Sequence, residues 1–189
     1  MLLSPHGAFR FDAETSVGAS SSIKFADGGL GRDQSPYAFT KATNSELVRN
    51  YSTWYGLPYA ITYFYNVYGP GERSGKYGTV IEIFRQKYLH GEPLPVNIPG
   101  TQRRIFTHID DIVAGLVLVG EKGEGDELGL GTDASYSILE LAHMFGSPIA
   151  MRPEVRGNRM QATLDTTKAR AIGWRAQHKL ADYIQSITT

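Results

Sequence analysis

An uninterrupted run of aromatic and β-branched residues at positions 59–65 constrains the fold of this chain more than any other segment. Such a run is typical of a strand buried on both faces, as in a parallel sheet covered by helices. Helical segments flank the run, because residues 36–54 and 79–89 carry apolar side chains at helical spacing and end near a glycine. This alternation of helix and strand predicts an α/β fold.

The rest of the chain continues the alternation. Short strands are expected at residues 94–98, 104–108, 127–131 and 149–152, and helices at 110–120, 166–172 and 179–187. A further helix is expected to begin after Ser137, which is placed to cap it with Glu140 in the capping-box position. Asp110 and Asp111 open another helix, where the helix dipole favours negative charge.

Composition restricts the classes of partner. Lys+Arg and Asp+Glu both number 19, and a formal net charge of +0 argues against nucleic acid. The absence of cysteine excludes disulfides, thiolate metal sites and cysteine nucleophiles, and it fits a reducing cytoplasm. No apolar run approaches the ~18 residues of a membrane helix, and the five histidines show no ligand-like spacing. We therefore expect a cytoplasmic protein without a membrane span, a secretory leader or a metal site.

Tyr37 and Lys41 are the strongest candidates for catalytic chemistry. Their four-residue spacing, in a segment expected to be helical after Ser35-Pro36, places them on one helix face. An ammonium beside a phenol favours the phenolate, and so lowers the tyrosine pKa from ~10 towards neutral pH. The tyrosine then becomes a usable general acid or base. Taken alone, the pattern is more typical of a solvent-exposed lysine above a half-buried tyrosine.

Three further motifs accompany this pair in a fixed order. They are Ser20-Ser21-Ser22, the segment Tyr-Phe-Tyr-Asn-Val-Tyr-Gly-Pro-Gly at 63–71, and Gly-Thr-Gln-Arg-Arg-Ile-Phe-Thr-His-Ile-Asp-Asp at 100–111. Together the four motifs resemble the extended short-chain dehydrogenase/reductase family, in particular its NAD-dependent nucleotide-sugar epimerases and dehydratases. The resemblance covers residues 17–189. It implies a partial Rossmann-like parallel sheet with a smaller C-terminal substrate-binding lobe.

The resemblance assigns catalytic and cofactor roles to particular residues. Tyr37 would be the acid/base, and Lys41 would lower its pKa and hold the ribose of the nicotinamide. The strand end at Tyr65 would face the nicotinamide itself. Either Ser21 or Ser22 would hydrogen-bond the substrate hydroxyl, and the alternative for these residues is a serine-rich turn.

The same resemblance assigns the substrate site. Asn66 and Arg104 would contact the nucleotide-sugar, and Arg156 or Arg159 would be a second clamp on its diphosphate. An arginine side chain offers a planar fork of donors that fits phosphate oxygens, although a solvated loop charge is the alternative. No Asp-Glu pair stands beside the serine run, which favours an epimerase over a dehydratase. UDP-glucose 4-epimerisation is therefore the expected activity.

One part of the family pattern is missing. The relatives open with Gly-x-x-Gly-x-x-Gly, whose backbone approaches the NAD pyrophosphate at a helix N-terminus. No such motif occurs here, and residues 28–31 are expected to form a loop. Residues 1–17 are an atypical leader, which is either foreign, the start of a truncated reading frame, or a replacement strand around residues 8–11. We expect the Rossmann-like part at 18–72 and mainly the substrate-binding lobe at 73–189, with some segments returning to the Rossmann part.

These observations predict a truncated NAD-dependent nucleotide-sugar epimerase-like protein that binds a UDP-sugar. NAD is the family's cofactor, and without the glycine-rich turn its binding by this chain is expected to be much weaker than in the relatives. A non-catalytic sugar-nucleotide-binding module and an inactive oligomeric fragment are the alternatives.

A homodimer or higher oligomer is also expected, because helices of this family often pack across a two-fold axis. The apolar stripes that could do so are Leu47, Val48, Tyr51 and Tyr55 on the first helix, and Ile81, Phe84 and Tyr88 on the second. Burial within one chain is the alternative for both stripes.

Overall fold

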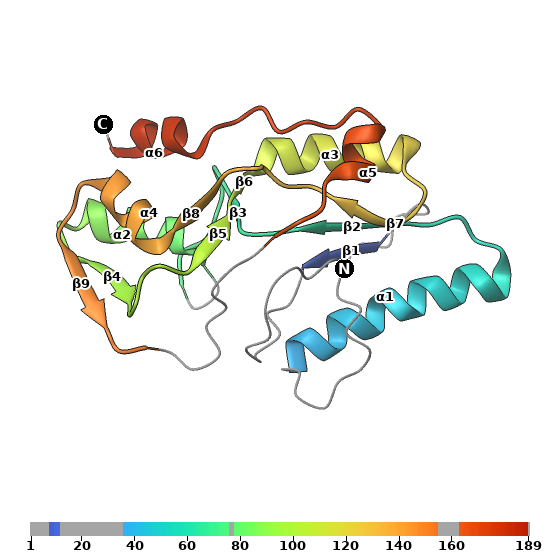
Figure 1. The fold of residues 1–189 in the computed structure, drawn as a ribbon, viewed down its shortest axis with the longest axis horizontal. Helices are drawn as coiled ribbons and strands as arrows, with labels where there is room; N and C mark the ends of the chain where they lie inside the picture. The colour runs from blue at the N-terminus through green and yellow to red at the C-terminus, as the bar shows by residue number, and fades with distance from the viewer. Residues whose placement is uncertain (1–7, 12–35, 76–77, 155–162, 189) are drawn as a thin grey trace.

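A parallel sheet forms one part of the computed structural model, which describes residues 8–11, 36–75, 78–154 and 163–188. Within those residues its strands are β1 (Ala8–Phe11), β2 (Ala60–Phe64) and β7 (Gly125–Gly129), in the order β1-β2-β7. The helix α1 (Pro36–Tyr55) lies on one face of the sheet, and α3 (Ile109–Lys122) and α5 (Thr167–Ala171) lie on the other (Figure 1). The expected α/β architecture with parallel strands is therefore present.

The central strand β2 is buried at every position, as its apolar run predicts. It pairs in parallel with β1, where Ala8 is opposite Ile61, and with β7, where Tyr63 is opposite Gly129. Residues 8–11 thus form a strand beside β2, as one of the three alternatives for the leader proposes. Apolar side chains of β2, β7, α3 and α5 form a core with Trp174.

The second part of the chain is built from short strand pairs and helices. Its strands are β3 (Val67–Tyr68), β4 (Leu94–Asn97), β5 (Arg103–Ile105), β6 (Thr107–His108), β8 (Ser135–Ser137) and β9 (Ile149–Arg152). Its helices are α2 (Val80–Leu89), α4 (Ile138–Phe145) and α6 (Leu180–Thr188). The pairs β3–β6 and β4–β9 are parallel, whereas β5–β8 is antiparallel. The division of the chain at residue 72 remains a prediction.

The helix starts are a mixture of expected and unexpected caps. Ser137 and Glu140 form the predicted capping box: the Ser137 hydroxyl accepts from the Glu140 N–H at 3.1 Å, and the Ser137 N–H donates to the Glu140 carboxylate at 2.6 Å. The start of α3 is capped by His108, whose Nδ1 accepts from the Asp110 N–H at 3.2 Å.

None of the described helices combines the length and apolar composition that a membrane span requires.

The two apolar stripes that were expected at a subunit interface differ in their exposure to solvent. On α2, Ile81 and Phe84 are buried in the chain's own core with β4, α4 and α6, and the Tyr88 hydroxyl donates to the Thr188 carbonyl at 2.7 Å. The stripe on α2 is therefore not a free surface, which corrects that part of the expectation. On α1, Leu47, Tyr51 and Tyr55 remain exposed.

Two substitutions on α2 test this correction. Ile81 is 1% exposed and Leu89 is 55% exposed. We expect Ile81→Ala to lower the free energy of unfolding by about 2–5 kcal/mol, because it opens a cavity in a packed core. Leu89→Ala, which removes apolar atoms from the same helix, should cost less than about 1 kcal/mol. Urea denaturation at two protein concentrations measures both, and a loss for Ile81→Ala that depended on concentration would instead place Ile81 at a subunit contact.

Candidate functional site

The helix α1 carries both members of the predicted acid/base pair. Tyr37 and Lys41 both have helical backbone, so their spacing places them on one side of α1. The Lys41 side chain is half-buried, whereas the side chain of Tyr37 lies outside the described part of the chain. Ser21 and Ser22 also lie outside it. The pairing of these groups therefore remains a prediction.

An ion pair fixes α1 over the sheet. Arg49 lies about two turns beyond Lys41, and its Nε donates to Oδ2 of Asp126 at 2.9 Å. The buried Tyr63 of β2 donates its hydroxyl to Oδ1 of the same carboxylate at 2.7 Å. Burial opposes the charged guanidinium, but the hydrogen bond and charge of Asp126 outweigh it, and the pKa of Arg49 is raised. The helix that carries Lys41 is thereby anchored to both β2 and β7.

The carboxyl end of β2 carries the next predicted residues. Tyr65 is buried, and Asn66 adopts a positive φ of 35°, which asparagine tolerates better than most residues. The Asn66 amide donates to the carbonyl of Ile105 at 2.9 Å. After it, Gly69 has φ 140°, and a Cβ there would lie 2.6 Å from the Ile109 side chain, so only glycine fits the turn.

Arg104 belongs to β5, directly before the residue that Asn66 contacts. Its side chain is buried, and its Nη1 donates to the Arg103 carbonyl at 2.9 Å. Arg103 is half-exposed and pairs with Glu140 at 3.0 Å. The Asn66 side chain thus contacts the backbone of β5 next to Arg104, near the carboxyl end of β2, where α/β sheets bind ligands. Arg156 and Arg159 lie outside the described residues and remain predictions.

A cluster around the start of α3 was not anticipated from the sequence. Asp111 is 3% exposed, and its carboxylate accepts from the N–H groups of Gln177 and His178 at 3.0 Å and from the His178 ring at 2.9 Å. The ring of His178 stacks on that of His108 with centroids 4.3 Å apart. These contacts attach the C-terminal segment to α3, and no spacing in the sequence connects residues so far apart.

Three side chains of this cluster carry atoms that could serve as metal ligands. The ligand atoms of His108, Asp110 and His178 all lie within 4.8 Å of one another. However, the two imidazole planes are only 21° apart, so their in-plane lone pairs do not converge on one ion. The Nδ1 atom of His108 is also used to cap α3. The arrangement therefore suits a structural contact better than a metal site.

Comparison with known proteins places these residues in context. The model of the NAD dependent epimerase/dehydratase family matches residues 16–131. The low-salt glycan biosynthesis protein Agl12 of Haloferax volcanii is 30% identical over 171 residues, which cover 86% of this chain and 54% of that protein. The UDP-N-acetyl-alpha-D-glucosaminuronate decarboxylase of Bacillus cytotoxicus is 33% identical over 135 residues, covering 71% and 39%.

The solved structure of UDP-glucose 4-epimerase from Thermotoga maritima with UDP-glucose matches 96% of this chain and 62% of its own, with a TM-score of 0.82 and 22% identity. At this identity the likeness concerns the fold, and it confirms the expected Rossmann-like α/β class. The chain spans about half the length of the curated relatives that it matches.

The cluster at α3 predicts that acidification weakens the fold in two steps. Burial and the neighbouring His178 lower the pKa of His108 below its ordinary ~6.5, so the stability held by the neutral ring is complete above about pH 6.5 and is lost as the pH falls through the folded pKa. Burial raises the pKa of Asp111, but hydrogen bonds from His178 and Gln177 outweigh it and lower that pKa. A second loss therefore follows as the pH falls below about 4.

Urea midpoints measured between about pH 3 and pH 8 check both steps. His108→Asn keeps a capping side chain but no longer titrates, so its upper step should be shallower than that of the unmodified chain. His143→Asn replaces an exposed histidine of α4 and should leave both steps in place. An unchanged upper step in His108→Asn would show that His108 does not cause it.

Proposed function

Because the chain belongs to the NAD-dependent epimerase/dehydratase family, we propose that it binds a UDP-sugar and that its activity is epimerisation of the UDP-glucose 4-epimerase type. The observation that carries the proposal is the contact of Asn66 with β5 beside Arg104, at the carboxyl end of β2. The UDP-sugars in the names of the matched proteins support the choice of ligand. A cytoplasmic location is part of the same proposal.

In this proposal Arg104 and Asn66 bind the nucleotide-sugar. A buried guanidinium meets a diphosphate in surroundings of low dielectric constant, where the attraction is stronger than in water. Asn66 directs one amide hydrogen to the Ile105 carbonyl, which fixes the side chain and leaves its oxygen for a sugar hydroxyl. Arg156 or Arg159 supplies the second clamp on the diphosphate.

The residues of α1 move the proton. The phenolate of Tyr37 takes the proton from a sugar hydroxyl that Ser21 or Ser22 holds by a hydrogen bond, and Lys41 lowers the tyrosine pKa. NAD⁺, when bound, would accept the hydride from the same carbon and would give it back to the other face of that carbon once the keto-sugar has turned. The half-buried Lys41 ammonium and the backbone at the strand end near Tyr65 fit the nicotinamide end of that cofactor. Tyr37 returns the proton after the keto-sugar has turned.

The sequence contains no glycine-rich turn for the pyrophosphate of NAD. With contacts at the nicotinamide end alone, we expect NAD affinity to be much weaker than in relatives that carry this turn, and we expect little or no epimerisation by these 189 residues unless NAD is in large excess. This absence favours a second candidate function, a non-catalytic sugar-nucleotide-binding module. Turnover of UDP-glucose with added NAD separates the two, because the module binds the sugar nucleotide and converts none of it.

Substitutions distinguish residues that bind the substrate from residues that take part in proton transfer. We expect Arg104→Ala to weaken UDP-glucose binding at least about tenfold, since a charge-assisted contact to phosphate is lost. Tyr37→Phe should change the affinity less than about twofold, because the phenol acts in proton transfer. Arg103→Ala is the matched control, as Arg103 pairs with Glu140 instead. Isothermal titration calorimetry measures all three, and undiminished binding by Arg104→Ala would refute the assignment of the phosphate clamp.

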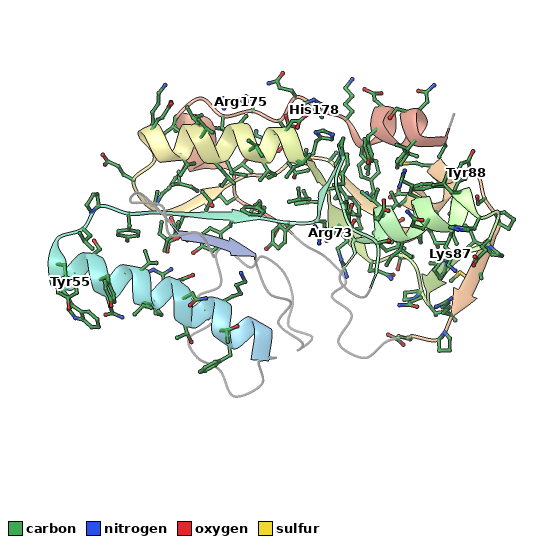
Figure 2. The ribbon with its side chains drawn as sticks, turned by 180° about the vertical axis from the view of Figure 1, so that it is seen from behind. Tyr55, Arg73, Lys87, Tyr88, Arg175 and His178 are labelled. Atoms are coloured by element: carbon green, nitrogen blue, oxygen red, sulfur yellow. The ribbon has the colours of Figure 1, made fainter. Side chains whose placement is uncertain are left out.

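The exposed face of α1 supports a homodimer. Leu47, Tyr51, Trp54 and Tyr55 are 43–66% exposed. The ring of Tyr51 lies 5.8 Å from that of Trp54 and 5.3 Å from that of Tyr55, so the aromatic surface is continuous. Figure 2 shows Tyr55 at the outer end of α1, turned away from the sheet. A patch of this kind marks a protein contact, and a second copy of this face is its simplest partner.

Light scattering at micromolar concentration tests the dimer. We expect the unmodified chain to have the mass of a dimer, and the double substitution Tyr51→Glu with Trp54→Glu to give a monomer, because two buried charges would face each other across the contact. Val113→Glu with Val117→Glu changes equally exposed apolar residues of α3 and should leave the mass unchanged. A monomeric unmodified chain would contradict the proposal.

A further inference from the structure

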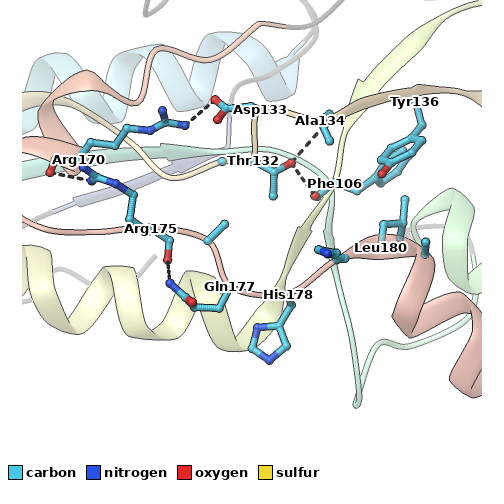
Figure 3. Close-up of a pocket in the computed structure, with 14 residues that line it drawn as sticks. Phe106, Thr132, Asp133, Ala134, Tyr136, Arg170, Arg175, Gln177, His178 and Leu180 are labelled. Carbon is cyan, nitrogen blue, oxygen red and sulfur yellow. Dashed lines mark hydrogen bonds and ion pairs between the residues drawn. The ribbon is translucent and has the colours of Figure 1, made fainter.

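A cleft of about 460 Å³ is lined by none of the described residues that we assign to the sugar nucleotide or to NAD. One wall is the connection from β7 to β8 with Tyr136 of β8, and the other is the C-terminal segment with Arg175 and Gln177 (Figure 3). Sites for small molecules commonly have volumes of about 300–1,000 Å³. The cleft is therefore large enough for a small metabolite.

The cleft carries an excess of positive charge. Arg170, Arg175 and Lys179 line it, and Asp133 is the acidic residue among its lining. Asp133 forms an ion pair with Arg170 (Figure 3). Neither Arg175 nor Lys179 has a carboxylate partner in the part of the chain that the structure describes. Two positive charges at this cleft therefore have no carboxylate partner among the described residues.

The Arg175 side chain is held in place by the fold. Its Nη1 donates to the carbonyl oxygens of Arg170 at 2.8 Å and of Trp174 at 2.6 Å. Trp174 is itself buried, and its indole N–H donates to the carbonyl of Asp111 at 3.0 Å. A guanidinium that is already ordered loses little conformational freedom when it binds a ligand. Within the described residues its Nε and Nη2 make no hydrogen bond, so they are available to an anion.

Apolar surface lies next to these charges. Phe106 and Leu180 are buried residues of the lining, and the half-buried Tyr136 presents its ring at the same cleft (Figure 3). A phosphate monoester carries about −1.5 to −2 charge at neutral pH, which matches two unpartnered cations better than a single carboxylate does. We propose that the cleft binds a small organic phosphate, whose phosphate group contacts Arg175 and Lys179 and whose apolar part lies against Tyr136.

Phenyl phosphate is the probe for this site. Titration of the ¹⁵N-labelled chain, followed by the amide signals in NMR spectra, should give saturable shifts at residues 132–136 and 175–180. The signals of Asn66 and Arg104 should stay in place, so the result is independent of UDP-glucose binding. Inorganic phosphate should bind more weakly, because it lacks the ring. The absence of saturable shifts up to about 10 mM probe, shifts elsewhere only, or equal binding of inorganic phosphate would overturn the proposal.

Charge variants complete the test. We expect the dissociation constant for phenyl phosphate to rise about tenfold in Arg175→Gln and about threefold or more in Lys179→Gln, since each loses a charge-assisted contact. Lys179→Gln removes an exposed charge without a structural hydrogen bond in the described chain, so it reports on binding even if Arg175→Gln is less stable. Lys122→Gln, at the last turn of α3, should leave the constant unchanged. Equal affinities in Lys179→Gln and Lys122→Gln would refute the role of Lys179.

Discussion

The complete burial of β2 is the constraint on which the rest of the structure depends. Its apolar side chains face both directions, so the strand is stable only with helices over both faces of the sheet. Its one long polar side chain, Tyr63, needs a partner for a buried hydroxyl and finds it in Asp126. Asp126 in turn holds Arg49 and thereby fixes α1. Hydrophobic burial and one buried hydroxyl thus determine where the helix with Lys41 lies.

Local signals were sufficient for the elements that have them. The run at 59–65, the helical period of α1 and the Ser137 capping box are properties of neighbouring residues, and the structure has all three. Strand β8 has no such signal, because it is short, polar and defined by its pairing with β5. The stripe on α2 was expected at a subunit contact, but it is buried in the core of its own chain. The sequence does not distinguish the two cases, because an apolar helix face has the same pattern whether its own chain or a second copy covers it.

The candidate site shows the same division between local and distant information. Motifs identified Asn66 and Arg104 individually, but not that the Asn66 side chain would reach the backbone of β5. The contacts of Asp111 with His178 join residues 67 positions apart. From the sequence alone, Asp111 is expected only to interact favourably with the dipole of the helix that it begins. For Ser21, Ser22, Arg156 and Arg159 the family pattern remains the whole basis of the assignment. Tyr37 has its backbone in α1, and its chemistry stays a prediction.

The C-terminal segment has a consequence for the order in which the protein can be completed during synthesis. Trp174 belongs to the core beneath α3, whereas Leu180 and Ile184 belong to the core formed with α2 and α4. The segment 174–184 therefore supplies buried side chains to both cores. Until they have left the ribosome, each core exposes apolar surface that only this stretch can cover. The nascent chain would then depend on protection from aggregation until residues 174–184 have emerged.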